Sequence, residues 1–373
     1  MFLRLLSTIV LLLSPIYTTA NSATNVGVAT LNYIDTSRPS WDGEGKRPVT
    51  SHLFYPTAEA HSEPLLLGQP GKELFNAGEV AWAAKPLFNE KMPLILMSHG
   101  TGGSALQMLW IAQRLVENGY LVLGVNHHGN TAIEPKKYAA GYTLWWERTR
   151  DLSFSLNSIL KDENWSQHID PSKIGVVGFS LGGYTALSAI GGITDRSLFK
   201  DFCHSQKRDF TCEGQAEFPN INEAFKKVEN NPYIKVSLSE HGSSYKIDQI
   251  SAAYILSPAV SQALTQESLM EISVPVSVAV GSLDSVAPSL TNAHRIASLI
   301  SGAEYKEIEK ASHYTFLSTC TPLGKKYLEG LCEDHKTLDR SQVHESLSLD
   351  ILKFFDQKLN RKEKQTMASY KEH

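Results

Sequence analysis

Hydrophobic and polar stretches alternate along this chain in the pattern of strands and helices. Short runs of apolar residues predict buried strands, and longer stretches with an apolar face predict helices. The predicted strands lie at residues 94–97, 120–125, 174–177, 252–256 and 274–280, with a last short one at 304–308. The predicted helices lie at residues 106–117, 142–160, 180–190, 289–300 and 341–359. This alternation predicts a mostly parallel sheet with helices on both faces, an α/β fold.

The segments before and between these elements are less regular. Residues 26–34 and 48–55 predict two strands, paired antiparallel at a sheet edge. Residues 57–91 contain several Pro and Gly and predict an irregular stretch with one helical turn at 80–84.

A polar stretch at residues 194–249 interrupts the alternation before the sixth predicted strand. It carries two cysteines and a short amphipathic piece at 221–228. We interpret it as an insertion. A cap over a site and a surface excursion without catalytic use are both consistent with its composition.

The residues Gly178-Phe179-Ser180-Leu181-Gly182 lie between a predicted strand and a predicted helix. A G-x-S-x-G pattern in this context predicts a sharp turn that exposes a serine hydroxyl at the end of the sheet. The alternative is a glycine-rich turn with an incidental serine. We predict Ser180 to be a nucleophile.

A serine hydroxyl needs a base to take its proton, and a carboxylate to orient that base. Asp284 follows the predicted strand 274–280, and His313 lies in the loop after the next strand. Ligands meet the carboxyl ends of parallel strands, so these loops converge with Ser180. The order Ser180, Asp284, His313 is that of α/β-hydrolases.

Other histidines compete for the role of base. His127 and His128 lie at a strand end but precede the serine, and His294 lies inside a predicted helix. We place His127 or His128, with His127 preferred, in the wall of the substrate pocket, together with the aromatic residues Phe179 and Tyr314. A metal site at His99, His127 and His128 lacks a further ligand at suitable spacing, and we predict no metal.

Acyl transfer also needs backbone donors for a developing oxyanion. We predict the N–H groups of Leu181, directly after the serine, and of Thr101. The second donor lies in the segment Ser98-His99-Gly100-Thr101-Gly102-Gly103, whose glycines let the backbone approach a substrate closely.

The first 23 residues have the pattern of a secretory signal peptide. Arg4 precedes an apolar run that Pro15 ends, and small residues follow at Ala20 and Ala23. An uncleaved membrane anchor is the alternative, although the run is short for a bilayer span. We predict an exported protein without a stable membrane span, a domain at residues 24–360 and a charged tail at 361–373.

The four cysteines are even in number, which in an exported chain predicts two disulfides. Neighbours in sequence suggest the pairs Cys203–Cys212 and Cys320–Cys332, one of three connectivities. A zinc site with His204 or His335 is the alternative.

The 373 residues include 42% hydrophobic and 20% charged side chains, which is an ordinary globular composition. The formal net charge of −4 gives no basic footprint for nucleic acid.

With these motifs, the chain resembles the α/β-hydrolase superfamily, and within it the dienelactone-hydrolase-like group that includes plasma-type platelet-activating-factor acetylhydrolases. The matching residues are 93–103, 176–183, 280–284 and 312–314. The resemblance implies ester hydrolysis through an acyl-enzyme, with Ser180, Asp284 and His313 as triad, Thr101 and Leu181 as oxyanion donors, and no cofactor. Dienelactone hydrolases proper usually carry a cysteine nucleophile, so the serine here favours ordinary esters.

We therefore expect a secreted serine hydrolase that acts on a small-molecule or lipid ester. A phospholipase or platelet-activating-factor-type acetylhydrolase is a narrower version. A serine peptidase and a non-catalytic binding protein with a hydrolase fold are the alternatives; the retention of all three triad residues argues against the latter. The sequence makes no prediction of the oligomeric state.

Overall fold

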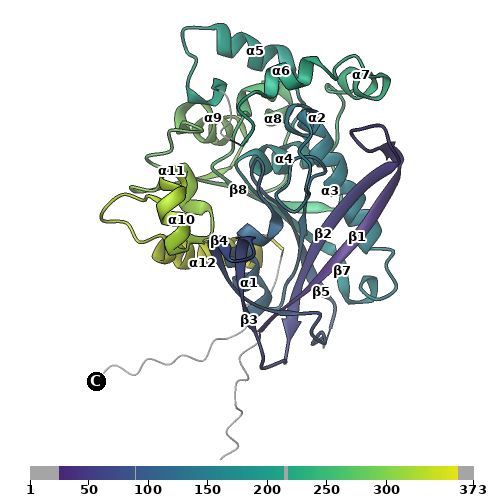
Figure 1. Ribbon diagram of the computed structural model, residues 1–373, viewed down its shortest axis with the longest axis vertical. Coiled ribbons are helices and arrows are strands. Elements are labelled where there is room, and N and C mark those ends of the chain that lie inside the picture. The colour runs from purple at the N-terminus through teal and green to yellow at the C-terminus, as the bar shows by residue number, and fades with distance from the viewer. Residues whose placement is uncertain (1–24, 89, 214–216, 360–373) are drawn as a thin grey trace, which may run out of the picture.

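The structure is a computed structural model of the chain, and it describes residues 25–88, 90–213 and 217–359. The predicted signal peptide at 1–23 and the predicted charged tail at 361–373 lie outside these residues. The described part forms one large sheet with helices on both faces (Figure 1).

Six neighbouring strands, counted from one edge of the sheet, run parallel in the order β10-β9-β8-β7-β5-β6. They are β5 (Met92–Ser98), β6 (Leu121–Val125), β7 (Ile169–Phe179), β8 (Ile250–Leu256), β9 (Val276–Gly281) and β10 (Glu304–Ile308). All six predicted strands are present, and the predicted α/β-hydrolase fold class is confirmed.

The register of these strands places their carboxyl ends side by side. Ser98 at the end of β5 pairs with Gly178 of β7, and Phe179 of β7 pairs with Leu256 of β8. The loops that follow the parallel strands therefore begin at one edge of the sheet, where ligands bind in open α/β folds.

Alternate residues of the strands face two different cores. Leu96 of β5 belongs to a core that also contains residues of α3 (Trp146–Ile159), α4 (Leu181–Ala189), α8 (Gln266–Met270) and α9 (Ala293–Leu299). Ile95, one residue earlier, packs on the other face with α1 (Leu109–Glu117) and α12 (Arg340–Lys358). Both strand faces are buried, which explains why these strands are apolar throughout.

The amino-terminal part differs from the prediction. β1 (Asn25–Pro39) and β2 (Lys46–Thr57) pair antiparallel as predicted. Residues 57–91, however, form a hairpin of β3 (Glu63–Gln69) and β4 (Lys72–Trp82), and no helical turn lies at 80–84. Proline and glycine obscure the alternation of this hairpin; Gly68 and Gly78, for example, have positive φ at its register shifts.

The hairpin changes two further expectations. β4 pairs with β1, and β11 (Thr319–Cys320) pairs with β4, so β1 and β2 do not lie at the edge of the sheet. Because β3 and β4 add two strands, the strand that follows the insertion is the eighth, β8, and not the sixth as predicted.

The predicted helix 142–160 is divided into α2 (Ala139–Thr143) and α3, because Leu144 leaves the helical region with ψ 71°.

The insertion at 194–249 contains α5 (Arg196–His204), α6 (Ile221–Lys226) and α7 (Pro232–Ser239). These helices lie together at the top of the view in Figure 1. Phe225 of α6 and Ile234 of α7 pack against Trp41 and Trp146 in a small core of their own. The insertion is therefore packed against the body of the fold.

Both predicted disulfides are present. Cys203 pairs with Cys212 inside the insertion, and Cys320 pairs with Cys332, which lies at the end of α11 (Glu329–Cys332). The segment between the second pair also contains α10 (Pro322–Tyr327). Because all four cysteines are paired, the zinc alternative is wrong.

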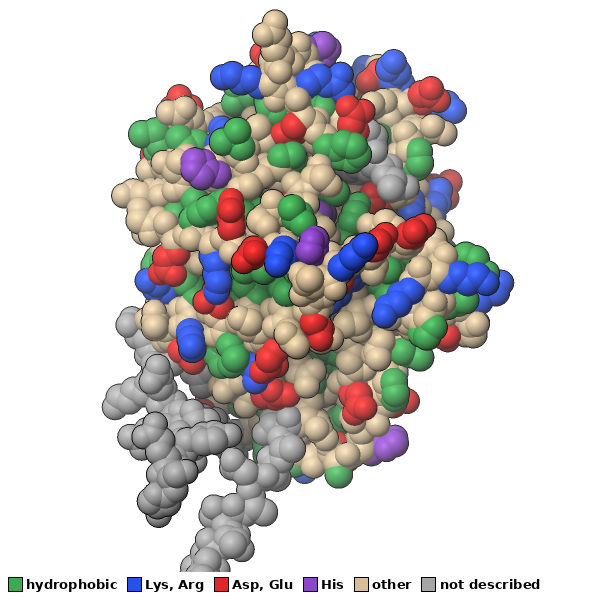
Figure 2. Space-filling model, turned by 90° about the vertical axis from the view of Figure 1, so that its left-hand side faces the viewer, with side chains coloured by type: hydrophobic (Ala, Val, Ile, Leu, Met, Phe, Trp, Pro, Cys, Tyr) green, Lys and Arg blue, Asp and Glu red, His purple; other side chains and the backbone are tan. Residues whose placement is uncertain are grey.

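Acidic and basic side chains are interspersed on the face that Figure 2 shows. Within residues 25–88, 90–213 and 217–359, no helix has the length and apolar character needed to cross a membrane.

Candidate active site

The segment around Ser180 forms a sharp turn between β7 and α4. Ser180 has φ 56° and ψ −120°, a strained conformation for a residue with a side chain. A Cβ on Gly182 would overlap the Ser98 carbonyl oxygen, and one on Gly178 would overlap the Gly182 carbonyl oxygen. Only glycine fits at both positions, so the G-x-S-x-G pattern is a steric requirement of this turn.

The structure brings the three residues predicted for catalysis into one hydrogen-bonded row. His313 Nε2 lies 2.9 Å from Ser180 Oγ, and His313 Nδ1 lies 2.7 Å from Asp284 Oδ2. With the proton on Nδ1, the imidazole donates to Asp284 and accepts from the serine hydroxyl. This is the arrangement of a nucleophile, a base and an orienting carboxylate.

Each member of the row is held by its own loop. The second oxygen of Asp284, Oδ1, accepts the backbone N–H groups of Val286 at 3.1 Å and of Ala287 at 2.8 Å. His313 begins a 3₁₀ turn, and the ring of Phe179 lies 5.0 Å from the imidazole, centroid to centroid. The carboxylate and the imidazole therefore have fixed orientations.

Thr101 and Leu181, the predicted oxyanion donors, flank the serine. Leu181 is the first residue of α4, so its N–H has no partner within the helix. Among the described residues, neither N–H donates to another group. A Cβ on Gly100 would lie 3.2 Å from Ser180 Cβ, which shows how closely the Gly100–Gly103 loop approaches the serine.

Side chains from the loop after β6 hold the Gly100–Gly103 loop in place. Asn130 Oδ1 accepts the Gly102 N–H at 2.6 Å, and Thr131 Oγ1 donates to the Gly103 carbonyl at 3.0 Å. Asn126 Oδ1 accepts the Ala105 N–H at 3.0 Å. The sequence reasoning missed these residues, although their place after the strand 120–125 was a usable signal.

Arg148 of α3 supports the same loop from inside the protein. Its guanidinium donates to the His99 carbonyl and to Thr185 Oγ1 of α4, and so links the Gly100–Gly103 loop to the helix after Ser180. Burial lowers the pKa of Arg148 to about 9. Burial, with Arg148 nearby, lowers the pKa of His99 well below its usual value, so His99 is neutral.

His127 does not lie where the sequence analysis placed it. The side chain is wholly buried and does not line the cavity; its Nε2 lies 2.8 Å from Ser98 Oγ and its Nδ1 lies 3.5 Å from Asp151 Oδ2. Burial lowers its pKa to about 3. Its placement in the pocket wall is wrong, because the end of β6 directs this residue into the interior.

A buried cluster of charges lies behind His127. Arg47 makes two hydrogen bonds to the Asp151 carboxylate, at 2.7 and 2.9 Å, and Arg38 contacts both Asp151 and Glu147. Burial alone would raise the pKa of Asp151, but Arg47 and Arg38 hold it well below its usual range. The cluster ties β1 and β2 to α3, which carries Arg148.

A cavity of about 390 Å³ opens above Ser180. Thr101, Phe179 and Tyr314 line this cavity, together with Ser180 and His313. Phe210, Thr211, Glu213 and Glu217 of the insertion line another part of its wall. Burial, with smaller effects of Glu217 and Asp284, raises the pKa of Tyr314 to about 12, so its hydroxyl is protonated at neutral pH.

The histidines of the metal alternative do not come together with further ligands in the described ranges. These ranges contain no group of three His, Cys, Asp or Glu side chains placed to hold an ion. His128, which belonged to the metal alternative, instead contacts Ser40 and Glu134.

The architecture is the α/β-hydrolase fold, with a mostly parallel sheet between two layers of helices. Residues 80–197 match the model of the dienelactone hydrolase family, a segment that includes the Gly100–Gly103 loop and Ser180. The predicted resemblance to the dienelactone-hydrolase-like group is thereby confirmed.

Two similar proteins extend this comparison. Protein phosphatase methylesterase 1 of Schizosaccharomyces pombe is 33% identical over 95 residues, which cover 24% of this chain and 25% of that protein. The chain thus spans about a quarter of that relative. The structure of a ferulic acid esterase from Streptomyces cinnamoneus superposes with a TM-score of 0.60 at 17% identity, over 93% of each chain. This second likeness concerns the fold.

Proposed function

We propose that this protein is an exported serine hydrolase that cleaves carboxylic esters through an acyl-enzyme. The observation that carries the proposal is the unbroken row from Ser180 Oγ through His313 to Asp284, at the bottom of a cavity. The family match and the two esterases among the similar proteins support hydrolysis of an ester. The two disulfides support export, since disulfides persist in oxidising compartments.

In the first half of the reaction, Ser180 Oγ attacks the ester carbonyl while His313 Nε2 takes the hydroxyl proton. The negative oxygen of the tetrahedral intermediate accepts hydrogen bonds from the N–H groups of Thr101 and Leu181. Asp284 stabilises the imidazolium. The intermediate then collapses, His313 returns the proton to the leaving alkoxide, and an alcohol departs.

In the second half, water replaces the alcohol. His313 takes one proton from the water, whose oxygen attacks the acyl carbonyl. Collapse of the second intermediate breaks the bond to Ser180 Oγ, and His313 protonates this oxygen. The products are a carboxylic acid and the free enzyme. These reaction steps need no metal or organic cofactor.

A cavity of about 390 Å³ favours a small ester. Small-molecule sites have volumes of roughly 300–1,000 Å³, and this cavity lies near the lower limit. Its aromatic lining, with Phe179 and Tyr314, suits an apolar acyl or alkyl group. The narrower alternative, a phospholipase or platelet-activating-factor-type acetylhydrolase, is tested by including short-chain phospholipids among the substrates.

The test is hydrolysis of p-nitrophenyl esters of increasing chain length, with a fluorophosphonate probe for the nucleophile. We expect turnover and labelling of the parent protein, and the loss of both in Ser180→Ala. Absence of turnover and labelling in the parent would contradict the enzymatic function, and full activity of Ser180→Ala would contradict the nucleophile.

A further inference from the structure

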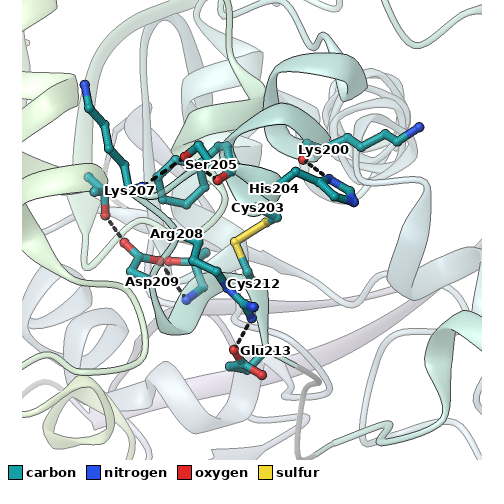
Figure 3. Close-up of a disulfide and its surroundings, with 12 residues drawn as sticks. Lys200, Cys203, His204, Ser205, Lys207, Arg208, Asp209, Cys212 and Glu213 are labelled. Carbon is teal, nitrogen blue, oxygen red and sulfur yellow. Dashed lines mark hydrogen bonds and ion pairs between the residues drawn. A yellow bond between two sulfur atoms is a disulfide. The ribbon is translucent and has the colours of Figure 1, made fainter.

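The disulfide Cys203–Cys212 closes a short loop in the insertion, and this loop reaches the cavity. Cys203 lies in α5 and Cys212 ends a 3₁₀ turn, Phe210–Cys212 (Figure 3). Phe210 and Thr211, the two residues before Cys212, line the cavity above Ser180. The covalent bond therefore fixes the segment that forms part of the cavity wall.

The other side of this loop is fixed to the segment that follows Asp284. Asp209 accepts a hydrogen bond from Thr291 Oγ1 and caps the 3₁₀ turn by accepting the Thr211 N–H at 2.9 Å. Thr211 Oγ1 accepts from Asn292 Nδ2 at 3.1 Å. The turn is thus held between α5 and the residues before α9, and Phe210 has little freedom to change its place.

Phe210 is unusual among the cavity residues because it is large and apolar, yet the residue is 59% exposed. Nothing in the packing of the insertion uses this ring: it belongs to none of the hydrophobic clusters of the described residues. A rigidly held turn that presents an exposed aromatic ring to a catalytic cavity is suited to contact a ligand.

The second disulfide, Cys320–Cys332, also closes a loop that reaches the cavity. Cys320–Cys332 closes the segment with α10 and α11, and Leu331, the residue before Cys332, also lines the cavity. In both loops an apolar residue of the wall lies one or two positions before a disulfide-bonded cysteine. The two bonds thus fix two parts of the wall that the central sheet does not carry.

We propose that the loop Cys203–Cys212 selects the substrate, and that Phe210 contacts the apolar chain of an ester of medium length. This inference rests on the proposed ester hydrolysis and specifies its substrate class. Because Ser180 and Phe210 line the same cavity, a longer chain extends from the serine toward the ring of Phe210 in this proposal, whereas an acetate ester occupies only the part of the cavity next to Ser180. The disulfide acts through Phe210 because it holds the turn that presents the ring.

The test compares the parent with Phe210→Ala and Phe210→Leu on two ester series. One series lengthens the acyl chain from two to eight carbons at a constant leaving group, and the other lengthens the alcohol at constant acetate. We expect Phe210→Ala to lower kcat/KM about tenfold for the long esters of one series, mainly because KM rises. For the shortest ester, kcat/KM should fall less than twofold. Phe210→Leu should recover most of the loss.

Leu198→Ala is the matched control, because Leu198 is an exposed apolar residue of the same insertion that does not line the cavity. It should leave both profiles unchanged. The double variant Cys203→Ser/Cys212→Ser should show the same length-dependent loss, and adding Phe210→Ala to it should cause little further loss, since the changes affect one unit.

Chain-length profiles of Phe210→Ala that match the parent in both series would overturn the inference. A loss of equal size for short and long esters would do so as well. Failure of the proposed function has a different result: the parent would cleave no ester and Ser180 would not react with a fluorophosphonate. The Phe210 variants keep the test decisive if the cysteine variant does not fold, because Phe210 is a surface residue.

Discussion

Asn130 accepts the backbone N–H of Gly102 at 2.6 Å, and its amide group donates to the Gly141 carbonyl at 3.1 Å. One buried side chain thereby joins the Gly100–Gly103 loop to α2. In the proposed mechanism this loop supplies the Thr101 donor, so Asn130 acts on the oxyanion through the backbone that it positions.

Asn130→Ala should therefore lower kcat by about 10- to 100-fold with a small change in KM. Loss of one oxyanion donor costs about 10²–10³ in rate, and a misplaced donor costs part of this. Steady-state kinetics on a short p-nitrophenyl ester measures the two constants. Asn130→Asp keeps the acceptor for Gly102 and should recover part of kcat; a pure rise in KM would contradict the positioning role.

Asp284→Asn should reduce kcat by about 10³- to 10⁴-fold while the fold is retained. The new amide oxygen can still accept the N–H groups of Val286 and Ala287, but its NH₂ would face His313 Nδ1. The imidazole would then carry its proton on Nε2 and could not accept from Ser180. Activity within tenfold of the parent, with an unchanged circular dichroism spectrum, would contradict the role of Asp284.

The charge of Glu217 should affect which esters react. Glu217 lines the cavity, and among the described lining residues there is no Lys or Arg. Glu217→Lys should raise kcat/KM about fivefold for the mono-p-nitrophenyl ester of adipic acid, whose free end is a carboxylate. The expected change corresponds to about 1 kcal/mol for a partly exposed charge pair.

Two comparisons isolate this effect of charge. p-Nitrophenyl hexanoate, which has no carboxylate, should change less than twofold in Glu217→Lys. Glu223→Lys is the control variant, because Glu223 is an exposed residue of α6 in the same insertion and does not line the cavity. An equal gain for both esters would exclude an electrostatic cause.

Buried histidines should make the protein less stable in acid. His344 Nε2 donates to the Thr315 carbonyl at 2.8 Å, below the turn that carries His313, and burial lowers its pKa to about 4. Above pH 6.5 the side chain is neutral in both the folded and unfolded states. Between pH 6.5 and about 4 only the unfolded state binds the proton, so the free energy of unfolding falls as the pH falls.

His344→Gln should reduce this dependence by up to about 1.4 kcal/mol per pH unit in that range. Glutamine can still donate to Thr315, so the fold should persist. Denaturant unfolding at pH 7, 6 and 5 with intact disulfides measures the slope, and His335→Gln, at an exposed histidine, is the control. Equal slopes in the parent and His344→Gln would disprove the assignment.

The sequence by itself determined the features that depend on neighbours along the chain. The strand–turn–helix context around Ser180 and the glycines at 178 and 182 follow from local geometry, since a side chain at either glycine has no space. The alternation of apolar strands and amphipathic helices predicted a mostly parallel sheet, and parallel strands bring the loops with Asp284 and His313 to the same sheet edge as the serine. Short separations also led to the correct cysteine pairs.

Only the tertiary structure decided the features that depend on contacts between distant segments. The β3–β4 hairpin is stabilised by pairing with β1 and β11, which its own glycine-rich sequence does not reveal. His127 and Asn130 follow the same strand, yet one turns into the interior and the other supports the Gly100–Gly103 loop. Phe210 lies thirty residues after Ser180, and the disulfide with its hydrogen bonds to Thr291 and Asn292 brings it to the cavity. Local patterns describe each segment separately, whereas these places result from packing among segments far apart in sequence.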